Sequence, residues 1–365
     1  MSFDRDRLVG AIRSAGCDGL VVRDPCFWTY LAGFALPGTL ARHLDWIGGP
    51  RPSFALMTAS GERILLVDTF SHALCEQRVG VGVEGYEVYR DDPLAVLAQL
   101  VRTHCGKQAR LAIDRAALWL WSENAGGVPF AHTVSDSMIW RIMAQKSDAE
   151  VARIRKACHL LDDAFAALAE DPPKHCTEAT LHARIVGWCL DHGSQFTHGI
   201  LNVERNEVMY AGESQLEIVP GDVVRTDYVA YFDGYPGHQS RMLVRGAPSS
   251  AQLDRYARLL DVHRALLERC RPPMLGSEVH ALVGELFAKQ GMDYRGKIAG
   301  HGIGPWMHQQ YPTIAAGSSD PIEPGMVVAI EPYVGSWHLQ DVILIGMERN
   351  ALLSDRLDIT KPLTI

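Results

Sequence analysis

The sequence predicts an α/β domain followed by an α+β domain, and two observations support this division. The chain has 365 residues, which exceeds a typical single domain and suits two. Helical and strand-like patterns alternate over the first 145 or so residues, and a new helix signal then begins near residue 147. We therefore expect an amino-terminal domain over 1–145 and a second domain over 146–365.

In the amino-terminal domain, a helix is expected over residues 4–15, because Leu8 and Ile12 fall on one apolar face. Short apolar runs separated by turn residues predict the strands that follow, and Ser60-Gly61-Glu62 is the turn of a hairpin. The expected strands cover residues 19–22, 54–57, 63–67 and 111–113. Alternation of this kind indicates an α/β arrangement.

The second domain opens with a helix-start signal, since Ser147 and Glu150 have the spacing of a capping box. Further helices are expected over 178–190, over 250–270, and between a cap at Ser277 and an end at Gly291. The expected strands of this domain cover residues 223–229, 241–244, 326–331 and 342–345.

Composition excludes several classes of protein. Hydrophobic residues make up 47% and charged residues 21%, as in a globular protein with a substantial core. The formal net charge of -8 argues against nucleic acid or an anionic membrane as a partner. We expect a cytoplasmic protein, because the first residues lack the apolar core of a signal peptide. The eight cysteines include no Cys-x-x-Cys pair, so buried free thiols are expected rather than a zinc site or disulfides.

Chemically competent side chains lie on or beside the expected strands of the second domain. Asp227 stands within an apolar strand and Glu331 directly follows another, and burying either carboxylate without a partner is costly. His301 lies in a glycine-rich segment where the backbone can approach a ligand closely. Any one of these residues alone could be structural, but together they indicate one convergent site. The full set is Asp227, His238, His301, His308, Glu331 and Gln340.

Several of these segments resemble the motifs of the pita-bread hydrolases, which include creatinase, prolidase and Xaa-Pro aminopeptidase. The resemblance spans nearly the whole chain. It implies a pita-bread fold for the second domain, a small-molecule substrate, and a homodimer in which one subunit's amino-terminal domain covers the other's site. The matching segments are 28–34, 146–150, 221–227, 300–308 and 323–332.

The metal-ligand set implied by the resemblance is altered. Asp227, His301 and Glu331 match three of the family's five ligands, whereas His238 replaces the second aspartate. Gln340 replaces the final glutamate, unless a shortened connection brings Asp341 into its place. The two replaced positions supply the carboxylates that bridge two metal ions in the family. Imidazole has one lone pair and a carboxamide is neutral, so a dinuclear centre is not expected.

Two metal states remain open. Asp227, His238, His301 and Glu331 could together bind one transition-metal ion, since two imidazoles and two carboxylates suit such an ion. Alternatively no metal binds, as in creatinase, and side chains activate water directly. We favour the metal-free state, because two negative charges have been removed.

The catalytic residues suggested by the resemblance also depart from the pattern. Tyr210 stands where the family has a histidine, and a phenol is a poor base at neutral pH but can donate to an oxyanion. A general base would then be His301, His238 or His308, with Glu331 orienting it or sharing the proton.

Three further residues are candidates for substrate binding. Arg241 could hold a substrate carboxylate in a bidentate contact, or equally form a salt bridge to a neighbouring strand. Trp306 could line the site or belong to the core, and Gln340 offers a neutral polar group.

Three functions are therefore considered. We favour a creatinase-like hydrolase of a small amide or amidine C–N bond that has no dinuclear centre. The second is a metal-dependent Xaa-Pro-type dipeptidase with a mononuclear site. The third is an inactive pita-bread binding protein, as in histone-chaperone relatives of the fold. The polar character of His238, Gln340 and Tyr210 favours an enzyme, because a decayed site tends to fill with apolar residues.

Overall fold

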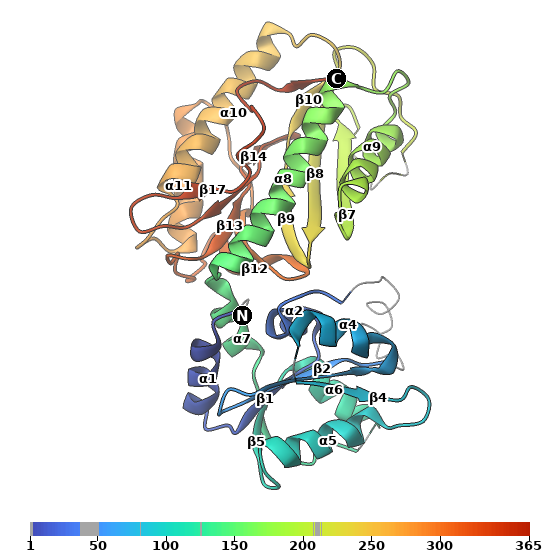
Figure 1. Ribbon diagram of the computed structural model, residues 1–365. Coiled ribbons are helices and arrows are strands. Elements are labelled where there is room, and N and C mark those ends of the chain that lie inside the picture. Colours follow the sequence, from blue (N-terminus) through green and yellow to red (C-terminus); the bar gives the residue numbers. More distant parts are fainter. Residues whose placement is uncertain are drawn as a thin grey trace. The chain divides into compact units, whose positions relative to one another are not determined.

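The structure is a computed structural model, and the residues it describes are 3–36, 51–80, 82–124, 126–206, 208, 212 and 214–365, without the side chains of 307–309. The chain separates into two compact units, Met1–Met143 and Ala144–Ile365 (Figure 1). Each unit has its own sheets and its own core.

The first unit contains a six-stranded mixed sheet in the order β4-β3-β2-β1-β5-β6. Strand β1 lies inside it, antiparallel to β2 and parallel to β5. The expected helix and strands of this region are confirmed. The strands are β1 (Gly19–Val22), β2 (Phe54–Thr58), β3 (Arg63–Asp68), β4 (Val83–Tyr86), β5 (Arg110–Ile113) and β6 (Ala131–Val134). The helices are α1 (Arg5–Ser14), α2 (Pro25–Ala32), α4 (Thr69–Val79), α5 (Pro93–His104), α6 (Arg115–Asn124) and α7 (Asp136–Ala144).

The second unit is built on two sheets. One has the order β18-β10-β8-β7 with β9 paired to β8, and the other has the order β12-β11-β13-β16-β17. A small hairpin of β14 and β15 lies apart from both orders. The first sheet contains β7 (Phe196–Val203), β8 (Val223–Phe232), β9 (Tyr235–Gln239), β10 (Met242–Val244) and β18 (Leu363–Thr364), and the hairpin contains β14 (Tyr333–Val334) and β15 (Trp337–His338). The second contains β11 (Ile298–Gly304), β12 (Met307–Ala315), β13 (Val327–Ile330), β16 (Asp341–Leu344) and β17 (Ala351–Leu352).

Among the described residues of the second unit, the helices are α8 (Asp148–Glu170), α9 (Glu178–Asp191), α10 (Ser250–Arg269) and α11 (Gly276–Lys289) (Figure 1). The capping box of α8 is confirmed, because Ser147 and Glu150 each accept the other's backbone N–H. The expected cap of α11 at Ser277 is wrong. That helix begins two residues earlier, where the Glu278 carboxylate accepts from the backbone N–H of Leu275 and so replaces a serine cap.

The expected strand over 241–244 is confirmed as β10, but a separate strand, β9, first returns along β8. A tight turn at Asp233 and Gly234, both with positive φ, returns the chain as β9 against β8. The chain then leaves that ladder at Ser240 and forms two backbone hydrogen bonds with Gln340, of 3.3 and 3.2 Å, before β10 resumes. Because Gln340 directly precedes β16, this bridge links the two sheets beside the candidate site.

Helix α8 packs closely on β9, and Gly237 makes the close approach possible. A Cβ at this position would overlap the backbone of Ala157 and Cys158, so neither neighbour could move aside as a flexible side chain would. We expect Gly237→Ala to destabilise the second unit by about 1–3 kcal/mol, the range for overpacking. Urea unfolding measures the change. Gly284→Ala is the control: its position on α11 is open, so alanine should add about 1 kcal/mol of stability. Equal effects of the two substitutions would contradict the prediction.

Candidate active site

Asp227, His238 and Gln340 form a hydrogen-bonded chain. Nε2 of His238 lies 2.9 Å from Oδ1 of Asp227, and Nδ1 of His238 lies 2.8 Å from Nε2 of Gln340. An amide nitrogen only donates, so Nδ1 of His238 accepts and Nε2 carries the proton that is donated to Asp227. Oε1 of Gln340 accepts from Ser240 at 3.2 Å. Both ring nitrogens of His238 are thus engaged by neighbouring side chains.

His301 and Glu331 form a second pair beside this chain. His301 lies on β11 opposite Ala329 of β13, and Glu331 directly follows β13, so the antiparallel register brings both to one end of the sheet. Nδ1 of His301 donates to the carbonyl of Gly302 at 3.1 Å, and Nε2 lies 3.8 Å from Oε1 of Glu331. The rings of His238 and His301 stack with centroids 5.3 Å apart. The structure therefore brings Asp227, His238, His301, Glu331 and Gln340 together.

The two carboxylates of the site differ in their electrostatics. Burial, together with the negative charge of Asp227, raises the pKa of Glu331 to about 7, against the lowering effects of His238 and Arg225. Burial also disfavours the ionised form of Asp227, but the hydrogen bond and electrostatic attraction of the His238 N–H outweigh it and hold the pKa of Asp227 well below its usual range. At neutral pH, Asp227 is fixed as an anion while Glu331 can gain or lose a proton.

Arg241 is buried and its guanidinium is occupied. It donates to Asp341 at 2.7 Å, to Asp162 at 3.3 Å, and to the carbonyl oxygens of Ser240 and Gln340. The salt-bridge alternative is thus what the structure contains, and the expected contact with a substrate carboxylate is not supported. Arg241 ties α8, β16 and the bridge at Ser240 together.

Asp341 faces this network and not the candidate site. Its Oδ1 accepts from Arg241 and Ser354, and its Oδ2 lies 2.7 Å from Nε2 of His263. Burial opposes its charge, but Arg241 and His263 hold the pKa of Asp341 below its usual range. Of the two residues considered for the final ligand position, Gln340 is the one that contacts His238.

Three sequence candidates remain, namely Trp306, His308 and Tyr210, and the structure describes the side chain of the first. Trp306 has a positive φ of 56° and its ring centroid lies 5.3 Å from that of Tyr231 on β8. His308 lies on β12, and its side chain is outside the described part of the structure. Tyr210 is also outside the described residues.

Three residues at the site were not proposed from the sequence: Arg225, Tyr333 and His338. Arg225 precedes Asp227 by two positions on β8, so both side chains project from the same face of the strand. Its guanidinium lies 5.8 Å from the centroid of Tyr333, and the ring of Tyr333 meets that of His338 at 73° with centroids 6.0 Å apart. The period of two along β8 could have identified Arg225. Tyr333 and His338 depend on the β14–β15 hairpin, which the sequence pattern does not indicate.

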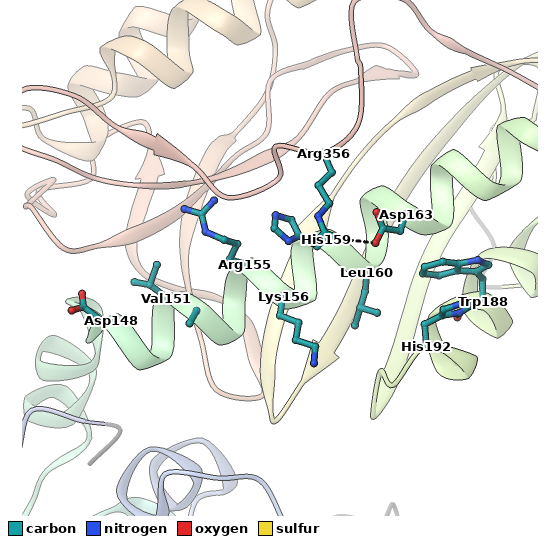
Figure 2. Close-up of a pocket in the computed structure, with 11 residues that line it drawn as sticks. Asp148, Val151, Arg155, Lys156, His159, Leu160, Asp163, Trp188, His192 and Arg356 are labelled. Carbon is teal, nitrogen blue, oxygen red and sulfur yellow. Dashed lines mark hydrogen bonds and ion pairs between the residues drawn. The ribbon is translucent and has the colours of Figure 1, made fainter.

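A pocket of about 700 Å³ lies elsewhere in the second unit, along α8 (Figure 2). It is lined by Arg155 and His159 of α8, which both pair with Asp355, at 2.8 and 2.7 Å. Trp188 and His192 of α9 stack on each other at its side. None of the residues of the candidate site lines this pocket, and Arg155, His159 and Arg356 in its lining already have carboxylate partners, so its volume does not make it the reactive centre.

The two sheets of the second unit and their order match the pita-bread fold of solved relatives. A model of metallopeptidase family M24 matches residues 152–354, which is more than half of the chain. The chain therefore belongs to this family, and is a hydrolase of the peptidase type that acts on C–N bonds.

Individual relatives agree with this assignment. The "Uncharacterized peptidase YqhT" of Bacillus subtilis is 23% identical over 366 residues, covering 96% of this chain and 97% of that protein. An Xaa-Pro dipeptidase from Bacillus anthracis has the same fold, with a TM-score of 0.80, 21% identity and 99% of both chains covered. The fold also occurs in the N-terminal domain of FACT complex subunit SPT16 from Cicer arietinum, with a TM-score of 0.68 and 16% identity. The expected fold and family resemblance are confirmed.

Among the helices that the structure describes, each falls short of the length or apolar character needed to cross a membrane.

The family name implies bound metal ions, and the donor atoms of this site do not fit a dinuclear centre. The lone pair of His238 accepts from Gln340, and its N–H is directed at Asp227. The amide oxygen of Gln340 accepts from Ser240, and the positive charge of Arg225 acts on both Asp227 and Glu331. Within the described residues, no three or more His, Cys, Asp and Glu side chains surround a common point as metal ligands do. His238 and Gln340 thus use their donor and acceptor atoms in hydrogen bonds with neighbouring side chains.

Proposed function

We propose that this protein hydrolyses a small amide or amidine at its C–N bond, using Glu331 and His301 as the proton-transfer pair. The observation that carries the proposal is the buried carboxyl group of Glu331, whose pKa is raised to about 7 and which lies 3.8 Å from Nε2 of His301. A general base works best when its pKa lies near the operating pH. Family membership supports hydrolysis of a C–N bond.

In the proposed reaction, ionised Glu331 takes a proton from water as the water oxygen bonds to the carbon of the C–N group. The C–N bond then breaks, and the proton removed from water passes to the leaving nitrogen. His301 is fixed in orientation by its Nδ1–H bond to Gly302, which directs Nε2 toward Glu331. A small rotation of either side chain would close 3.8 Å to hydrogen-bond length and let the pair share the proton.

A positioning role falls to Asp227, His238 and Gln340. Because Asp227 accepts from His238 and Gln340 donates to it, the imidazole is held in one tautomer and one orientation. Its ring stacks on His301 and limits the rotation of that ring. We infer that this chain of contacts positions the proton-transfer pair in place of the ions that bridging carboxylates would hold.

Removal of metal tests the proposal against the mononuclear dipeptidase. After extensive dialysis against a chelator, we expect less than one equivalent of metal per chain and unchanged hydrolysis. Elemental analysis gives the metal content, and release of amine from Xaa-Pro dipeptides and from small amides and amidines gives the activity. Loss of activity with the metal and its return with one equivalent of a divalent ion would establish the mononuclear dipeptidase instead. If neither form hydrolyses any of these compounds, a binding function would replace the enzymatic one.

A further inference from the structure

The β14–β15 hairpin joins two parts of the candidate site and belongs to neither of the two larger sheets of the second unit. Glu331 stands two positions before the hairpin and Gln340 two positions after it. Each strand of the hairpin has two residues, and a two-stranded ribbon of this length is marginally stable by itself. The placement of the site residues on both sides of the hairpin therefore depends on contacts that anchor it.

Glu204 anchors the hairpin through one carboxylate oxygen. Its Oε1 accepts from Nε1 of Trp337 at 3.1 Å and from the guanidinium of Arg255 at 3.2 Å. Glu204 directly follows β7, and its backbone N–H donates to the carbonyl of Val223 at 2.8 Å, so its own position is fixed. Arg255, on α10, lies 5.1 Å from the centroid of the Trp337 ring and donates to the carbonyl of Val334 at 3.4 Å. We refer to Glu204, Arg255 and Trp337 as the Glu204 clasp.

The hydrogen bond to Trp337 is the stronger part of the clasp. The side chains of Glu204 and Arg255 are 41% and 42% exposed, so solvent screens their ion pair. Trp337 is 1% exposed, and loss of its acceptor would leave a buried donor without a partner, which costs more. The other polar contact on β15 joins the backbone N–H of His338 to Sδ of Met242, and a thioether is a weak acceptor. Glu204 is therefore the main polar anchor of β15.

We propose that Glu204 is a positioning residue, which fixes the β14–β15 hairpin through Trp337 and thereby places Glu331 and Gln340. The inference rests on the proposed function, in which Glu331 is the base and Gln340 holds the imidazole of His238. Among the described residues, the side chain of Glu204 bonds to Trp337 and Arg255 and to no residue of the candidate site. A group that touches no reacting atom can still control the rate, because small displacements of catalytic groups have large effects.

Two NMR signals and hydrogen exchange test the clasp without any substrate. Trp337→Phe identifies the indole N–H signal of Trp337 by its absence, and His238→Gln identifies the Nε2–H signal of His238. In Glu204→Ala we expect both signals to move, the first directly and the second through Gln340. Amide hydrogen exchange over residues 333–338 should accelerate about 10-fold or more, as for a buried donor left without its acceptor.

Kinetics separate positioning from folding. The kcat of Glu204→Ala should fall about 10- to 100-fold, as for slightly misplaced catalytic groups, while KM stays close to that of the wild type. Glu204→Gln keeps an oxygen acceptor for Trp337 and loses the charge opposite Arg255, so it should restore most of kcat and of the protection from exchange. Arg258→Gln is the matched control, because Arg258 lies on the same helix as Arg255 and pairs with Asp254 of that helix. It should match the wild type in every measurement.

Three results would overturn the proposal. In the first, Glu204→Ala leaves the exchange of the hairpin amides unchanged. In the second, the hairpin loosens while the His238 signal and kcat stay as in the wild type, which would limit Glu204 to a local structural role. In the third, Glu204→Gln is as damaging as Glu204→Ala. If the wild type hydrolyses none of the tested compounds, the proposed function fails, and the exchange and His238 signals still decide whether Glu204 positions this segment.

Discussion

Glutamine at position 331 is expected to lower kcat/KM by about 10²- to 10⁴-fold, the range for removing a general base. In the wild type, kcat/KM should rise as pH increases through about 7, because the proposed base must be ionised and its pKa is about 7. In Glu331→Gln this limb of the profile should disappear. Measurement of kcat/KM from pH 5 to 9 on the substrate identified by amine release checks both expectations.

The free energy of unfolding of Glu331→Gln should rise at pH 8 although its kcat/KM falls. A lower kcat/KM can therefore be attributed to lost catalysis and not to lost folding. The pKa of Glu331 is raised from 4.5 to about 7 in the folded state. Ionising this group therefore costs stability increasingly as pH rises from about 4.5 to 7, and the full cost applies above that range. Glu331→Gln should thus be more stable than the wild type at pH 8, and similar to it at pH 4. Exposed Glu323, on the same segment, is the control, and Glu323→Gln should leave kcat/KM unchanged. A retained pH limb in Glu331→Gln would assign the base elsewhere.

Replacement of Arg241 by methionine is expected to destabilise the second unit by about 3–5 kcal/mol, the cost of removing one partner of a buried ion pair. Asp162 and Asp341 would then face each other's charge in the interior without the guanidinium that now contacts both. Chemical unfolding, followed by signals from the second unit, measures the loss.

Arg356 gives the matched control for this substitution. It pairs with Asp163 at 2.8 Å, but its side chain is about half exposed, so solvent screens the interaction. Arg356→Met should change stability by about 0–1 kcal/mol. A loss below 1 kcal/mol for Arg241→Met would show that the interior accommodates the two aspartates without it.

Local patterns were sufficient to predict much of the fold. The capping box at Ser147 and Glu150 depends on contacts within four residues, and it is present as expected. The cap of α11 was missed because Glu278 reaches back to a leucine, a case in which the preference for serine at a cap does not decide the start. The division between β9 and β10 could not be seen in the sequence, because it is caused by pairing of Ser240 with a residue 100 positions away.

The sequence could predict those site residues whose burial in an apolar strand would cost free energy unless they had a partner. Asp227 and Glu331 stand out as acids on apolar strands, and the structure brings them together with the histidines. Arg225 and Arg241 could not be distinguished in this way, since one lies on β8 and the other directly before β10, which pairs with β8. Only the location of Asp162 and Asp341 shows that Arg241 is compensated, and only the β14–β15 hairpin shows that Arg225 meets Tyr333 and His338.

The backbone bridge between Ser240 and Gln340 has a consequence for when the protein can become active during synthesis. His238 precedes the bridge and Gln340 forms it, so their contact requires segments 102 residues apart to be in place. Contacts so distant along the chain form late, after the entropy of closing a long loop has been overcome. A nascent chain that ends before Gln340 therefore has Asp227 and His238 but cannot hold the imidazole from both sides. Such a chain lacks the ordered imidazole that the proposed proton-transfer pair requires.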